Sequence, residues 1–154
     1  MHPFMKKAID LAIKNVEDGG QPFGAVLAKN DKIIAEGVNE LHNTYDISGH
    51  AELIAIRKAQ EILQTNDLSG FTMYASGHPC PMCYTAMYLA GIRDIYFGNG
   101  IEETAKAGLT ASAKLYSDLK LDNEKREVVM KHLPLTSDME NPMTLWTDRQ
   151  ATNE

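Results

Sequence analysis

The sequence predicts an α/β fold of three layers, α/β/α, in which helices flank a mixed five-stranded sheet. Short apolar runs bounded by turn residues recur along the chain, and segments with apolar residues at helical spacing lie between them. Five runs have the length expected of strands: residues 25–28, 33–35, 71–75, 94–97 and 128–130. A chain of 154 residues with 44% hydrophobic residues can form one domain with a buried core.

The first elements in the chain are a helix and a hairpin. Apolar residues recur at helical spacing from Phe4 to Val16, and Gly19 with Gly20 ends this segment. Only the polar stretch 29–32 separates the first two strands, which predicts a tight turn between antiparallel strands.

Two helices are predicted as crossovers between the later strands. The first, 51–63, follows a polar loop that runs from Asn39 to Ser48. The second begins at Pro81, a residue suited to the first turn of a helix, and runs to Gly91. Because each helix lies between two strands of one sheet, the last strands that they connect are expected to be parallel.

The end of the chain carries weaker patterns. We expect a helix over 104–119, an edge strand at 128–130 and a helical tail over about 141–154 that contains Trp146. The sequence shows no repeat, linker or low-complexity stretch, so residues 1–154 are interpreted as a single domain.

Composition and charge exclude several classes of protein. No apolar run approaches the roughly 20 residues of a membrane helix, and the first residues lack the apolar core of a signal peptide. Two cysteines at metal-binding spacing favour a reducing compartment, so a cytoplasmic location is expected. The formal net charge of −6 argues against a nucleic-acid partner, which requires a basic surface.

Two short strings, His50-Ala51-Glu52 and Pro79-Cys80-Pro81-Met82-Cys83, carry the residues with the clearest chemistry. The C-x-x-C spacing lets one turn of backbone present two thiolates to a zinc ion, and His50 is the third candidate ligand. Three protein ligands leave a fourth position for water, as in catalytic zinc sites. Glu52 would then act as a base beside that water rather than as a ligand.

A closed structural zinc site is the alternative interpretation. His78 or His42 could supply a fourth ligand, but Glu52 would then have no role. The predicted helix starts at His50 and Cys80 favour the catalytic interpretation, because helix N-termini carry partial positive charge and lower the pKa of nearby thiols.

At these residues the chain resembles the cytidine deaminase-like superfamily, over roughly residues 4–108. The motifs that match are PFGAV at 22–26, HAE at 50–52 and PCPMC at 79–83. The resemblance implies the cytidine deaminase-like fold, with Zn²⁺ bound by His50, Cys80 and Cys83. It also implies that Glu52 carries protons during deamination. By the same resemblance, the substrate-binding residues are Asn39, Phe23 and Ala51.

Within this superfamily the chain resembles bacterial guanine deaminases more closely than tRNA adenosine deaminases. The segments 105–108 and 141–146 carry this likeness, and the second implies a homodimer in which the tail 141–154 swaps between subunits. The resemblance implies hydrolytic deamination of a guanine-type base or nucleoside, a small molecule, with water and release of ammonia. One departure leaves the base open, because the stretch 109–112 has no carboxylate where guanine deaminases carry acidic residues.

Two other functions remain open at this point. The first is deamination of adenosine in tRNA, which the same zinc motifs would serve. The second is a zinc-stabilised binding module without catalysis.

Overall fold

A computed structural model describes residues 1–153 and contains a four-stranded mixed sheet in the order β2-β1-β3-β4. The strands are β1 (Gly24–Lys29), β2 (Lys32–Val38), β3 (Thr72–Gly77) and β4 (Asp94–Asn99). β1 pairs antiparallel with both β2 and β3, whereas β3 and β4 are parallel, as the predicted crossovers require.

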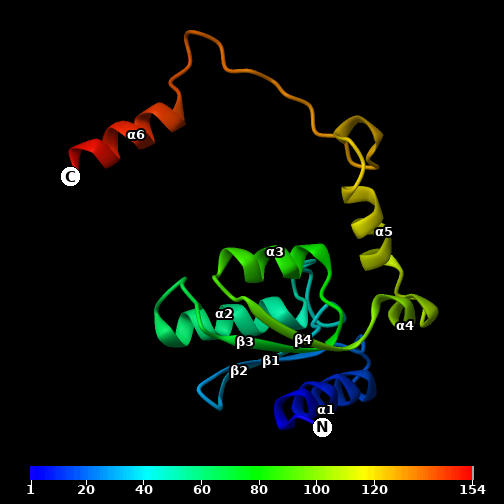
Figure 1. The fold of residues 1–154 in the computed structure, drawn as a ribbon. Helices are drawn as coiled ribbons and strands as arrows, with labels where there is room; N and C mark the ends of the chain where they lie inside the picture. The colour runs from blue at the N-terminus through cyan, green and yellow to red at the C-terminus, as the bar shows by residue number, and fades with distance from the viewer. Residues whose placement is uncertain (154) are drawn as a thin grey trace. The chain divides into compact units, whose positions relative to one another are not determined.

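Helices cover both faces of this sheet (Figure 1). α1 (Pro3–Glu17) packs on one face, and α2 (Ala51–Leu63) with α3 (Pro81–Leu89) lies on the other. The three-layer α/β/α arrangement is therefore confirmed. The main core lies between the sheet and α2 with α3, where the fully buried side chains include Leu27, Met73 and Met87.

The predicted number of strands was wrong, because the described residues contain no strand after β4. The segment 128–130, expected as an edge strand, is irregular. The Asn123 side chain takes both backbone groups of Met130: Nδ2 donates to the carbonyl at 2.7 Å and Oδ1 accepts from the N–H at 3.0 Å. A strand would need those groups for its ladder.

The single helix predicted over 104–119 was also wrong. The structure has two short helices there, α4 (Ile101–Lys106) and α5 (Ala111–Leu119). Gly108 lies between them with φ +89°, the left-handed conformation that ends helices and that glycine adopts without a steric penalty.

The chain forms two compact units, Met1–Lys120 and Leu121–Glu154. The first contains the sheet and α1 to α5. Within its described residues, the second contains the short 3₁₀ helix η1 (Asn123–Lys125) and α6 (Pro142–Thr152), and none of them is buried. No helix in the described part of the chain is long and apolar enough to span a bilayer.

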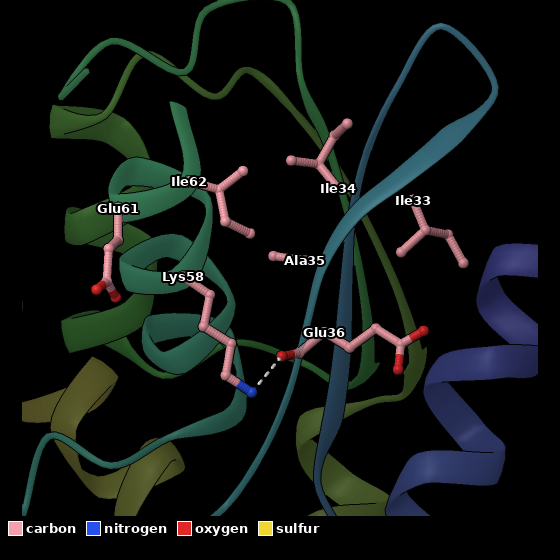
Figure 2. A pocket seen from close by; sticks show the side chains of 7 residues that line it. All are labelled: Ile33, Ile34, Ala35, Glu36, Lys58, Glu61 and Ile62. Atoms are coloured by element: carbon pink, nitrogen blue, oxygen red, sulfur yellow. Dashed lines mark hydrogen bonds between the residues drawn. The ribbon is translucent and has the colours of Figure 1, made fainter. Parts of the chain in front are cut away.

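The outer edge of the sheet at β2 is partly covered by a lysine. Lys58 of α2 donates from Nζ to the Glu36 carbonyl at 3.1 Å (Figure 2). The two residues border a surface groove of about 390 Å³ between β2 and α2, which is otherwise lined mainly by aliphatic side chains. This contact occupies one backbone acceptor of the edge strand, which is then not available for pairing with another chain. None of the predicted site residues lines this groove.

Candidate metal centre and active site

The two crossover helices bring His50 together with the two cysteines. His50 is the N-cap of α2, Cys80 is the N-cap of α3, and Cys83 lies in the first turn of α3. The Nδ1 atom of His50 lies 3.5 Å from Sγ of Cys80 and 3.5 Å from Sγ of Cys83. One histidine nitrogen therefore faces both sulfurs at equal distance.

These distances fit tetrahedral zinc. Typical Zn–N and Zn–S bond lengths with a tetrahedral angle give an N···S separation of about 3.6 Å. Among the described residues, this is the one group of three or more His, Cys, Asp or Glu side chains that could hold a metal. His78 and His42 are not part of it, so the donor set is the three-ligand set of a catalytic zinc site rather than a closed structural set.

The two thiols have unequal electrostatic environments. A hydrogen bond from Cys83, together with His50, lowers the pKa of Cys80 to about 4. The same hydrogen bond raises the pKa of Cys83, and burial of the Cys83 thiol raises it further. Cys80 is thus a thiolate at neutral pH, and a dipositive ion between the sulfurs would deprotonate Cys83 as well.

Glu52 lies in the first turn of α2, two residues after His50. Its side chain is only 6% exposed, and burial raises the pKa of its carboxyl group. It does not belong to the His50, Cys80 and Cys83 group. A buried carboxyl group beside a metal centre, with a raised pKa, has the properties of a group that both takes and gives protons near neutral pH.

The three residues predicted to bind substrate lie at the ends of elements: Phe23 comes directly before β1, Asn39 directly after β2, and Ala51 is the first residue of α2. Ala51 is fully buried between His50 and Glu52. The Asn39 backbone N–H donates to the Phe23 carbonyl at 3.1 Å, so these two residues are neighbours. The Phe23 ring lies against Gly77 at the end of β3, where an added Cβ would come within 2.9 Å of the ring.

The amide of Asn39 has a defined orientation. Its side chain is 1% exposed; Oδ1 accepts the Leu41 backbone N–H at 3.1 Å, and Nδ2 donates to Oε1 of Gln21 at 3.4 Å. Because the NH₂ group has two protons, one donor remains for another acceptor.

Two residues that support the site were not predicted. Asn15 of α1 is buried and donates from Nδ2 to the Asn39 carbonyl at 2.9 Å. In the sequence, Asn15 lies on the same helix face as the buried residues Ala8 and Ala12. A polar side chain on a buried face needs a hydrogen-bond partner, and this pattern could have identified Asn15. Tyr116 of α5 donates its hydroxyl proton to the Pro79 carbonyl at 2.7 Å, and no local pattern indicates this long-range contact.

Comparison with known proteins agrees with this geometry. The family described as the cytidine and deoxycytidylate deaminase zinc-binding region matches residues 1–99. A guanine deaminase of Bacillus subtilis (strain 168) is 36% identical over 144 residues, 93% of this chain and 91% of the relative. A tRNA-specific adenosine deaminase of the same organism is 40% identical over 95 residues, 62% of this chain and 59% of the relative.

Solved structures show the same likeness. The X-ray structure of guanine deaminase from Bacillus subtilis superposes with a TM-score of 0.83 at 33% identity, covering 98% of this chain and 92% of that one. A guanine deaminase from Nitrosomonas europaea gives 0.64 at 28% identity, covering 68% and 62%. With the His50, Cys80 and Cys83 group in place, this chain belongs to the cytidine and deoxycytidylate deaminase family and is a zinc-dependent hydrolytic deaminase.

Proposed function

We propose that this protein deaminates a free guanine-type base or nucleoside by hydrolysis and releases ammonia. The observation that carries the proposal is the extent of similarity. The likeness to guanine deaminase covers 93% of the chain, whereas the likeness to the tRNA-specific adenosine deaminase of the same organism covers 62%. The zinc residues lie within the family region, residues 1–99, and the likeness to guanine deaminase extends beyond that region.

The proposed roles at the metal follow from the donor set. His50, Cys80 and Cys83 hold the zinc ion. When bound, zinc acidifies a water molecule for attack on the carbon that carries the amino group. Glu52 would accept one proton from the attacking water and pass it to a ring nitrogen of the base. It would then take the remaining proton from the hydroxyl group added to the carbon and give it to the amino group, so that the C–N bond breaks and ammonia leaves as the carbonyl forms.

Burial suits Glu52 to this proton transfer. A carboxyl group that is desolvated holds a proton more tightly than one in water, and its pKa is raised accordingly. Its two roles, accepting a proton from water and donating one to the amine, require a pKa closer to neutrality than that of an exposed glutamate.

The base is proposed to bind against Phe23, Asn39 and the backbone of Ala51. The amide of Asn39 has one free donor, because its oxygen and its other N–H are engaged by Leu41 and Gln21. We therefore infer that Asn39 donates to a carbonyl oxygen or an unprotonated ring nitrogen of the base. Guanine offers both kinds of acceptor.

Ser112 on α5 is proposed to face the base as well. Its Oγ is buried and, within the described part of the chain, has no hydrogen-bond partner. It lies one helical turn before Tyr116 and so shares a helix face with a residue that contacts the loop of Cys80. A hydroxyl group both donates and accepts, so it would tolerate more bases than a carboxylate does.

A homodimer is also proposed. The second unit exposes large apolar side chains and contains no buried residue among those described, and Trp146 on α6 is 64% exposed. A segment of this size cannot bury a core of its own. We infer that α6 packs on a second copy of the chain.

The test is ammonia release by the zinc-loaded protein from guanine, guanosine, adenine, cytosine, isocytosine and pterins. We expect turnover of guanine, or of another base in which one ring nitrogen lies between an amino-bearing carbon and a carbonyl carbon, and none of adenine. The second candidate function, deamination of adenosine in tRNA, rests on the 40% identity over 95 residues. Turnover of tRNA with none of the free bases, together with tight binding in gel shifts, would replace the proposed function by that one.

A further inference from the structure

The carbonyl group of Pro79 is the backbone acceptor next to a zinc ligand. Pro79 is buried and comes directly before Cys80, the N-cap of α3. The helix begins its hydrogen-bond ladder one residue later, where Tyr84 N–H donates to the Cys80 carbonyl at 2.9 Å. The Pro79 carbonyl must therefore find a donor outside α3, because a buried acceptor without a partner is destabilising.

That donor is supplied by a distant helix. The Tyr116 hydroxyl lies 2.7 Å from the Pro79 oxygen, and it comes from α5, 37 residues further along the chain. The ring of Tyr116 also packs edge-on against His78, with 5.5 Å between ring centres and an angle of 80°. Nδ1 of His78 lies 3.0 Å from the same Pro79 oxygen, so two side chains converge on this carbonyl.

The position of this carbonyl bears directly on the metal centre. A peptide unit is planar, so holding the Pro79 oxygen also holds the Cys80 nitrogen and limits where the Cys80 Cα can lie. The Cys80 sulfur is attached one bond beyond Cβ, and it must meet His50 Nδ1 and Cys83 Sγ around one ion. Partners of this kind, which orient metal ligands without touching the metal, set metal affinity in many sites.

We propose that Tyr116 is a positioning residue of the zinc centre: its hydroxyl group fixes the Pro79–Cys80 peptide and thereby aims the Cys80 thiolate at the metal. The proposal rests on the zinc site of the proposed function but not on the identity of the base. It assigns α5 a role at the metal that neither the motifs nor the donor set indicates.

The experiment compares Tyr116→Phe with Tyr88→Phe in the chain of 154 residues. Phe at 116 keeps the ring that packs on His78 and removes only the hydroxyl group. Tyr88 is an exposed tyrosine on α3, the helix of the zinc ligands, so it is the matched control. Zinc affinity is measured by competition with a chromogenic chelator, and the geometry of the site by the thiolate-to-cobalt absorption band of the Co²⁺-substituted protein.

We expect Tyr116→Phe to weaken zinc binding about tenfold and to change the Co²⁺ band, because loss of an outer partner typically lowers metal affinity 10- to 100-fold. Tyr88→Phe should match the wild-type protein in both measurements. A zinc affinity within twofold of wild type in Tyr116→Phe would overturn the proposal, as would an equal loss in Tyr88→Phe.

Stability is followed separately, by thermal unfolding of the metal-free proteins. A lower melting temperature for Tyr116→Phe with unchanged zinc affinity and Co²⁺ spectrum would mean that the contact is only structural, and this too would overturn the proposal. None of these measurements needs a substrate. A wild-type protein that deaminates no base would therefore defeat the proposed function and leave the role of Tyr116 intact.

Discussion

Helices α3 and α6 share two features at their starts and have different surroundings. Each has Pro at its first position, and each follows a residue in extended conformation, Cys80 or Asn141. α3, in the unit Met1–Lys120, buries Cys83 and Met87, whereas α6, in the unit Leu121–Glu154, buries none of its residues. Local signals at a helix start can therefore define a helix, but they do not determine what the helix packs against.

The same contrast holds for the chemistry of the two units. All three candidate zinc ligands, Glu52 and the Tyr116 contact lie before Lys120. The second unit contains none of them and instead exposes apolar side chains, including Leu133, Met143 and Trp146. The first unit is therefore expected to hold the metal and break the bond, and the second to provide contacts with another copy.

The largest expected effect is at Glu52. Glu52→Gln keeps the shape of the side chain and removes its ability to carry protons, so kcat should fall about 10²- to 10⁴-fold. Zinc content, measured by metal analysis, should stay at the wild-type value because Glu52 is not a ligand. Glu61→Gln, an exposed change on the same helix, is the control and should leave kcat unchanged. Retained turnover in Glu52→Gln would refute its assigned role.

Substitution of one methionine on each helix tests the difference in packing between α3 and α6. Met87 on α3 is 0% exposed and Met143 on α6 is 68% exposed. Met87→Ala should lower the free energy of unfolding by about 2–5 kcal/mol, because it leaves a cavity in the core. Met143→Ala should change it by less than about 0.5 kcal/mol in dilute protein, since an exposed side chain leaves no cavity. Denaturant titrations measure both, and equal losses would remove the distinction between the two units.

Removal of the second unit tests whether zinc binding depends on the first unit and dimer formation on the second. A chain that ends at Lys120 should bind zinc within about threefold of the full chain, because every ligand and the Tyr116 donor are retained. It should also be monomeric by light scattering at concentrations where the full chain is a dimer. A full chain that is monomeric at micromolar concentration would contradict the proposed dimer, and loss of zinc from the short chain would show that the metal site needs the second unit.

A similarly small effect on stability is expected at Ser112. Its buried hydroxyl group has no partner among the described residues, so Ser112→Ala should change the free energy of unfolding by less than about 0.5 kcal/mol. A fall in kcat/KM for the preferred base in this stable variant would then report a contact with substrate. Unchanged kcat/KM for every base in the panel would remove Ser112 from the proposed base site.

The sequence predicted correctly what short-range patterns determine. Apolar spacing located α1 and α2, and the Pro81 signal located the start of α3. The C-x-x-C spacing together with His50 indicated a metal group that the structure brings together. These features depend on residues within one or two turns of each other, or on ligand types that few other arrangements would use.

The remaining features depend on distant partners. The strand predicted at 128–130 was wrong because an apolar run does not show that the Asn123 side chain takes the backbone groups of Met130. The one helix predicted over 104–119 is two helices because of the left-handed conformation at Gly108. The Tyr116 contact with Pro79 joins residues that are adjacent only in the folded chain.

Ammonia release from guanine by the full chain, measured before and after removal of zinc, shows whether the metal centre breaks the C–N bond. Dialysis against a chelator should abolish the release, and added Zn²⁺ should restore it in proportion to the metal bound, up to one ion per chain. The Glu52→Gln protein should bind the same zinc and release ammonia at least about 100-fold more slowly. Release that persists in the metal-free wild-type protein would contradict the account that the His50, Cys80 and Cys83 group is the centre at which the C–N bond is broken.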